Sequence, residues 1–78
     1  MYMNATVSDA TTLGHAIRAE RRRQGLNQRT LAELSNVSVH FLSNLENGKA
    51  TSELRGCLSV LDTLGIQLVL RARNGAPH

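Results

Sequence analysis

The sequence has few of the features that mark secreted or membrane-bound proteins. It contains a single cysteine, Cys57, so no disulfide can form within the chain, and a reducing cytoplasm is the expected compartment. No apolar run approaches the ~20 residues that a membrane-spanning helix needs. The N-terminus has neither the basic nor the apolar segment of a signal peptide. We therefore expect a cytoplasmic protein that has no membrane partner.

Catalytic and metal-binding motifs are also missing. The three histidines, His15, His40 and His78, do not form a metal-ligand spacing with Cys57. The sequence has no glycine-rich phosphate loop and no pairing of a nucleophile with a base. We therefore expect no catalytic residues, no metal and no cofactor, and we do not expect an enzyme.

What the sequence does have is a short, basic chain. Its 78 residues make one small domain, which buries a limited core, and oligomerisation is a common remedy for that. Nine Lys and Arg residues, eight of them Arg, stand against six acidic residues and give a net charge of +3. The pI of about 10.0 fits a protein that binds nucleic acid.

Two short helices joined by a tight turn are predicted over residues 28–35 and 39–46. Asn27 is placed to cap the first, and the pair Val37-Ser38 repeats the same arrangement before the second. Asn36 falls where a left-handed residue should end the first helix. Helices joined so tightly must cross steeply, as in a helix-turn-helix. The apolar residues that share one side are Leu31, Ala32 and Leu34 in the first helix, and Leu42 and Leu45 in the second.

One further helix is predicted on each side of this pair. The first covers residues 13–24, with Thr11 or Thr12 as its N-cap and Gly25 as its stop. Arg22 and Arg23 in its last turn are interpreted as a solvated basic face rather than as phosphate contacts.

The last helix starts near Thr51 or Ser52 and ends at Gly65. Gly56 should weaken this helix by about 1 kcal/mol relative to Ala, unless something packs closely against it. The expected core stripe is Leu54, Cys57, Leu58, Leu61 and Leu64.

The pattern then changes to a period of two. In residues 66–73, Ile66, Leu68 and Leu70 alternate with Gln67, Val69 and Arg71, which predicts a β-strand. A lone strand leaves its backbone groups unpaired, so we expect it to pair antiparallel with its own copy across a two-fold axis. The residues expected to form the dimer contact are Leu61, Leu64, Ile66, Leu68, Val69 and Leu70.

The motif resembles the helix-turn-helix of the Cro/CI-type (XRE) repressor family over residues 13–64. Asn36 stands where that family most often has Gly, and both residues accept a positive φ. The resemblance implies an ion pair between Arg21 and Glu46 that ties the first helix to the end of the third. The residues that carry the resemblance are Leu13-Gly14, Ile17-Arg18, Arg21, Gly25-Leu26, Gln28, Leu31-Ala32, Val37-Ser38, Leu42, Leu45-Glu46 and Gly48-Lys49.

With a strand directly after the helices, the chain resembles antitoxins of the HipB type. This likeness implies a bacterial, nucleoid-associated homodimer that binds an inverted repeat of double-stranded operator DNA and holds a HipA-type kinase toxin. The expected fold is mainly α: a compact four-helix helix-turn-helix DNA-binding domain, with one C-terminal β-strand pairing across a homodimer. The expected division is a flexible arm (1–10), the DNA-binding domain (11–65), the dimerisation strand (66–73) and a flexible tail (74–78).

The outward side of the helix over residues 39–46 is expected to contact DNA bases. Residues flanking it, and the start of the helix before it, are expected to contact phosphates, because a helix N-terminus attracts anions. The expected base contacts are Ser38, Val39, His40, Ser43 and Asn44. The expected phosphate contacts are Asn27, Gln28, Arg29, Asn47 and Lys49.

Three functions remain open on the sequence alone. The chain could be an antitoxin that represses its own operon and neutralises a toxin. It could be a stand-alone repressor of the same fold, or a protein-interaction module that has lost DNA binding. The basic charge and the intact outward face argue against the third.

Overall fold

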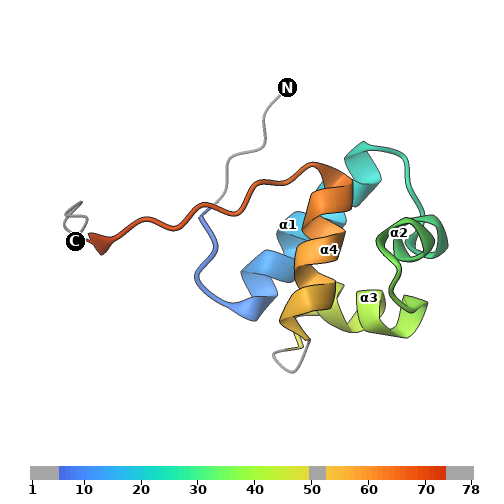
Figure 1. Ribbon diagram of the computed structural model, residues 1–78, viewed down its shortest axis with the longest axis horizontal. Helices are drawn as coiled ribbons and strands as arrows, with labels where there is room; N and C mark the ends of the chain where they lie inside the picture. The colour runs from blue at the N-terminus through green and yellow to red at the C-terminus, as the bar shows by residue number, and fades with distance from the viewer. Residues whose placement is uncertain (1–5, 50–52, 74–78) are drawn as a thin grey trace.

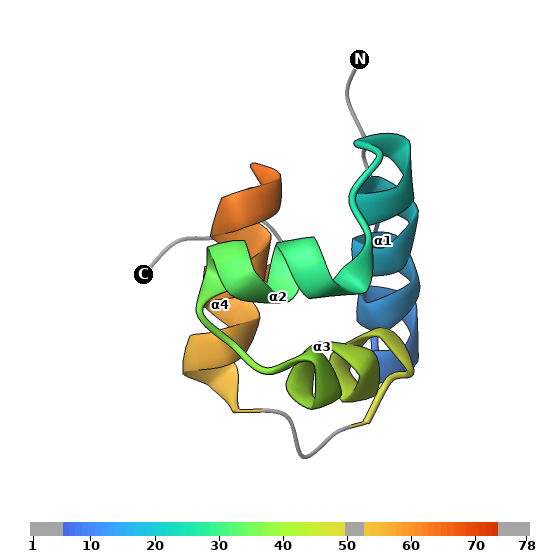
Figure 2. The same ribbon diagram turned by 90° about the vertical axis from the view of Figure 1, so that its right-hand side faces the viewer.

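A computed structural model describes residues 6–49 and 53–73, which form four helices (Figure 1). The helices are α1 (Ala10–Arg23), α2 (Gln28–Ser35), α3 (Val39–Glu46) and α4 (Leu54–Leu64). Helices α1 and α4 flank the other two, and α2 crosses between them above α3 (Figure 2). The prediction of a mainly α, four-helix domain is confirmed. Residues 1–5 of the expected arm and the whole expected tail lie outside the described residues. Thr51 and Ser52, near which the last helix was expected to start, also lie outside them, and α4 begins at Leu54 with Glu53 as its N-cap.

The local signals around the turn act as the sequence predicts. The Asn27 side chain accepts a hydrogen bond from the backbone N–H of Thr30 at 2.8 Å, and the Ser38 hydroxyl accepts one from Phe41 at 2.9 Å. Asn36 is left-handed, with φ 58° and ψ 43°. Figure 1 shows α2 nearly along its axis while α3 lies across the view, so the two helices cross steeply.

The start of α1 differs from the prediction. The N-cap is Asp9 rather than Thr11 or Thr12, and its carboxylate accepts from the backbone N–H of Thr12 at 2.8 Å. The Thr12 hydroxyl in turn accepts from the Asp9 backbone N–H at 3.2 Å, which completes a reciprocal capping box. The predicted N-cap was wrong because Thr12 lies inside the helix, where its hydroxyl supports the cap made by Asp9. The predicted stop at Gly25 is confirmed by its φ of +76°.

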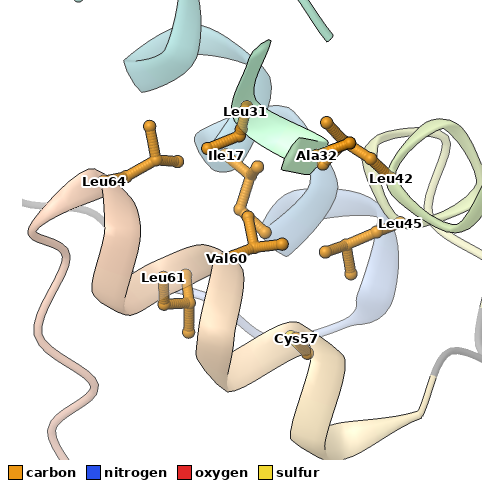
Figure 3. Packing of buried hydrophobic residues seen from close by; sticks show 9 residues of the cluster. All are labelled: Ile17, Leu31, Ala32, Leu42, Leu45, Cys57, Val60, Leu61 and Leu64. Carbon is orange, nitrogen blue, oxygen red and sulfur yellow. The ribbon is translucent and has the colours of Figure 1, made fainter. Parts of the chain in front are cut away.

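All four helices contribute to one hydrophobic core (Figure 3). Side chains from α1 and α2 meet those of α3 and α4, so no pair of helices buries its apolar face alone. The buried members are Ile17, Leu31, Ala32, Leu42, Leu45, Cys57, Val60, Leu61 and Leu64. Leu13, Leu26, Val37, Phe41 and Ile66 pack against its edge.

Three leucines expected in the core are exposed instead. The exposed fractions are 62% for Leu34, 67% for Leu54 and 42% for Leu58. In α4 the buried stripe runs through Cys57, Val60, Leu61 and Leu64. At 100° per residue, Leu54 and Leu58 both fall on one flank of that stripe. The expected stripe was therefore displaced toward that flank, and it omitted Val60, which is fully buried.

Glycines allow two close helix contacts. A Cβ on Gly14 would lie 2.4 Å from the Leu45 carbonyl oxygen and 2.6 Å from that of Glu46, so the backbones of α1 and α3 almost touch there. A Cβ on Gly56 would lie 2.6 Å from the ring of Phe41. The Phe41 ring is therefore the closely packed neighbour that accounts for a glycine at this position of the helix.

A polar contact joins the C-terminal ends of α1 and α4. Gln24 Nε2 donates to the Leu64 carbonyl at 2.8 Å and to Glu20 at 2.7 Å. Arg23 Nε donates to the same carboxylate at 2.8 Å. The hydrogen bonds from Arg23 and Gln24 lower the pKa of the buried Glu20 to about 2.

The expected strand is not observed in residues 66–73. Ile66 packs on the core, and its backbone N–H donates to the Leu61 carbonyl at 2.8 Å. After it the chain extends away from the helices (Figure 1), and Leu68, Val69 and Leu70 are exposed. A strand is defined by its backbone pairing, and the rest of the described chain offers this segment no edge to pair with.

Gly14→Ala should destabilise the fold by about 1–3 kcal/mol, although Ala favours helices, because the new methyl group meets backbone that cannot move independently. Gly56→Ala is the matched comparison. Its methyl group meets a side chain that can rotate, and it gains helix propensity, so the loss should be smaller. Urea unfolding of both variants measures the difference. Equal losses would contradict the assigned α1–α3 contact.

Glu20→Gln should destabilise the protein at neutral pH and lose its effect in acid. The folded pKa of about 2 lies below the ordinary value of 4.5, so the stabilisation is present above pH 4.5 and is lost as the pH falls through about 2. Thermal melts from neutral pH down to about pH 2 measure this. Glu33→Gln, at an exposed carboxylate of α2, is the control. A Glu20→Gln effect that does not change with pH would refute the assignment.

Candidate nucleic-acid interface

A buried ion pair lies where α1, α2 and α3 meet. Arg21 Nε donates to Glu46 Oε2 at 2.6 Å, and Arg21 Nη2 donates to Glu46 Oε1 at 3.0 Å. The side chains are 9% and 2% exposed. Arg21 Nη1 also donates to the Leu26 carbonyl at 2.8 Å, and Gln28 Nε2 donates to Glu46 Oε1 at 3.1 Å. This network fixes the start of α2 against the end of α3.

The outward side of α3 is polar and accessible. Leu42, Leu45 and Glu46 point into the molecule, and α3 lies along one edge of it in both views (Figures 1 and 2). On the other side, Val39 and His40 are exposed, and Ser43 and Asn44 are partly exposed. The structure therefore gathers four of the five expected base contacts on one accessible face of one helix.

The remaining expected base contact, Ser38, is partly committed to the fold. Its hydroxyl oxygen caps α3 by accepting one hydrogen bond, so its hydrogen and one lone pair are left for an outward contact. Within the outward face, Asn44 Nδ2 lies 3.2 Å from His40 Nε2, one helical turn away.

The expected phosphate contacts flank this face but differ in their exposure and in the hydrogen bonds described for them. The Asn27 side-chain oxygen caps α2, and the Gln28 side chain is half-buried against Glu46. Arg29, Asn47 and Lys49 are exposed. The first backbone N–H groups of a helix have no partner inside it, so the start of α2 can also offer the amides of Gln28 and Arg29 to an anion.

The expected dimer residues fall into three groups, of which one is Ile66 alone, half-buried at the edge of the core. Leu61 and Leu64 are 3% and 4% exposed and belong to the core of the chain itself. Leu68, Val69 and Leu70 are 58%, 65% and 91% exposed. Sequence reasoning missed that Leu54 and Leu58 are exposed as well. Their place on one flank of α4 was the signal that could have identified them.

Other chemistry is limited in the described residues. Burial raises the pKa of the Cys57 thiol, so it stays protonated and unreactive. In residues 6–49 and 53–73, no cluster of three His, Cys, Asp or Glu side chains could hold a metal ion. None of the helices described is long and apolar enough to cross a membrane.

Comparison with known proteins places the motif in a family. Residues 12–73 match the family model described as a helix-turn-helix domain. An uncharacterized HTH-type transcriptional regulator of Sinorhizobium fredii, y4mF, is 33% identical over 70 residues, which are 90% of this chain and 92% of that protein.

Solved structures share the same architecture. A HipB–O4 20mer complex contains a chain with a TM-score of 0.82 and 23% identity, covering 90% of this chain and 99% of that one. A HipA–HipB–O2–O3 complex contains a chain with a TM-score of 0.81, 23% identity and the same coverage. At this identity the likeness establishes a common fold.

Proposed function

The chain belongs to the helix-turn-helix family of DNA-binding transcriptional regulators, and we propose that it is a dimeric repressor that acts as an antitoxin. It is a regulator and not an enzyme. In the proposal it binds an inverted repeat in its own operator, in the bacterial cytoplasm at the nucleoid. It also binds and neutralises a HipA-type kinase toxin.

The observation that carries the DNA-binding mode is the orientation of α3. Burial of Leu42 and Leu45 on one side turns Val39, His40, Ser43 and Asn44 outward on the other. Ser and Asn side chains donate and accept hydrogen bonds at base edges, and Val can contact a thymine methyl group. Arg29, Asn47 and Lys49 would contact phosphates beside the groove and orient the protein without specifying sequence.

The antitoxin role is supported by the likeness to HipB. A HipB chain of closely similar fold occurs in a complex that also contains HipA. The likeness extends over 90% of this chain, which includes residues beyond the helix-turn-helix itself. A toxin that docks away from α3 would leave the groove-facing side free to bind DNA.

The dimer is supported by apolar surface that the single chain leaves uncovered. Leu54 and Leu58 on α4 and the segment from Leu68 to Leu70 are exposed. Pairing of residues 66–71 with a second copy would satisfy their backbone groups and cover these side chains. A two-fold axis would then place two copies of α3 about 34 Å apart, one turn of duplex, or somewhat further.

A stand-alone repressor is the alternative, because α3 and its flanks would act identically without a toxin. A module that has lost DNA binding is the third possibility, and the polar outward face argues against it. Affinity purification from the native host, followed by mass spectrometry, separates the first two. Recovery of a kinase from a neighbouring gene supports the antitoxin, and its repeated absence supports the stand-alone repressor.

Lys49→Ala should weaken binding to cognate and scrambled duplexes about equally and flatten the salt dependence by about 1 unit, because one phosphate contact is lost. Ser43→Ala should cost about 1–3 kcal/mol on the cognate duplex and little on the scrambled one. Titrations at several salt concentrations measure both effects.

Arg22→Ala is the charge-matched control for Lys49→Ala. It removes one positive charge from an exposed position on α1 and should leave the salt dependence unchanged. If Arg22→Ala flattened the slope and Lys49→Ala did not, the DNA-binding surface would lie on α1 instead of beside α3.

Truncation after Gly65 should produce a monomer that binds operator DNA weakly and melts at a lower temperature, because the pairing segment is gone. Truncation after Arg73 is the control and should remain dimeric. Sedimentation at tens of micromolar protein measures both. Full-length protein that sediments as a monomer at this concentration would refute the dimer.

A further inference from the structure

The contact between His40 and Asn44 joins two polar side chains that lie one helical turn apart. Asn44 Nδ2 lies 3.2 Å from His40 Nε2, and both residues lie on the outward side of α3. An amide nitrogen carries two hydrogens and can only donate. Nε2 of the imidazole can therefore pair with it as an acceptor, the role that this nitrogen has in the tautomer carrying the ring hydrogen on Nδ1. His40 is thus the acceptor that holds the Asn44 amide.

This hydrogen bond determines which polar groups of the Asn44 side chain remain available to contact a base. One amide hydrogen is bound to the ring, and Oδ1 and the second hydrogen remain. Adenine offers a donor at N6 and an acceptor at N7 in the major groove, and Asn meets both with one oxygen and one N–H. An amide turned over would present two donors to the groove, which fit the O6 and N7 acceptors of guanine.

An isolated Asn amide would not keep one orientation. The terminal torsion of Asn is broad and roughly two-fold, so rotamer preference alone does not choose between the two faces. Leu42, Leu45 and Glu46 face the opposite side of α3, so the core does not choose either. Among the hydrogen bonds in the described residues, the one to His40 is what orients the Asn44 side chain.

We propose that His40 is a positioning residue for base recognition: it fixes the Asn44 amide so that the two side chains together select adenine at one position of each half-site. The inference rests on the proposed DNA-binding function and deepens it by naming the base. His40 acts through Asn44 and need not contact a base itself.

The test is selection of bound sequences from a pool of random duplexes, followed by sequencing. Wild type is compared with Asn44→Ala, His40→Ala, the double variant and His40→Gln. Wild type should prefer adenine at one position of each half-site by about 5- to 150-fold, the range for one bidentate contact. Asn44→Ala and His40→Ala should both lose that preference at that same position. The double variant should lose no more than either single variant.

His40→Gln and thermal melting separate positioning from a structural role. The Gln side-chain oxygen can accept the Asn44 hydrogen bond, so this variant should keep most of the adenine preference. An exposed pair one turn apart contributes little to helix stability, so all the variants should melt within a few degrees of wild type. A purely structural role for His40 would move the melting temperature and leave the base preference unchanged.

Each other outcome overturns the inference in a different way. A change at a different position in His40→Ala would show that His40 contacts its own base. A uniform loss on all sequences would show a phosphate contact. Guanine at the shared position would show the opposite amide orientation. If the wild-type protein selects no sequence, the proposed function itself is overturned. If wild type and His40→Ala select the same site with the same adenine preference, only the inference about His40 is overturned.

Discussion

Glu46 is the side chain on which the arrangement of the first three helices depends. Its carboxylate accepts hydrogen bonds from Arg21 on α1 and Gln28 on α2, and it belongs to the last turn of α3. Loss of one partner from a buried pair of this kind costs about 3–5 kcal/mol, because the other charge is left uncompensated. Replacing both Arg21 and Glu46 with apolar side chains could give an equally stable protein. The ion pair is therefore important for holding the three helices in one geometry as well as for stability.

That geometry fixes the orientation of α3, on which its proposed role depends. Leu42 and Leu45 anchor the helix to the core, and Glu46 fixes its end, so each outward side chain has a set position relative to the start of α2. The proposed base-reading face needs this rigidity, because hydrogen bonds to base edges tolerate little displacement. The same packing that buries one side of α3 leaves the polar side chains on its other side exposed.

The parts of the fold that the sequence predicted are those set by neighbouring residues. Asn27, Asn36 and Ser38 act within three or four positions of themselves, so their roles could be inferred without the structure. The hydrogen bond from Gln24 to the Leu64 carbonyl joins residues 40 positions apart, so no local sequence pattern predicts it. Leu34 shows the limit of periodicity, because an eight-residue helix buries a narrower stripe than its apolar pattern predicts. The strand prediction concerned pairing with another chain, which one chain cannot display.

The close approach at Gly14 has a consequence for how this protein can diverge. The α1–α3 contact there is made with the carbonyl groups of Leu45 and Glu46 and not with any side chain on the outward face of α3. Side chains on that face can therefore be exchanged without altering how α3 packs against α1. Duplicated copies of such a gene could acquire new operators by changing a few outward residues, while inheriting the scaffold unchanged. Because the α1–α3 contact does not involve the proposed base-reading face, one scaffold could serve many different DNA sequences.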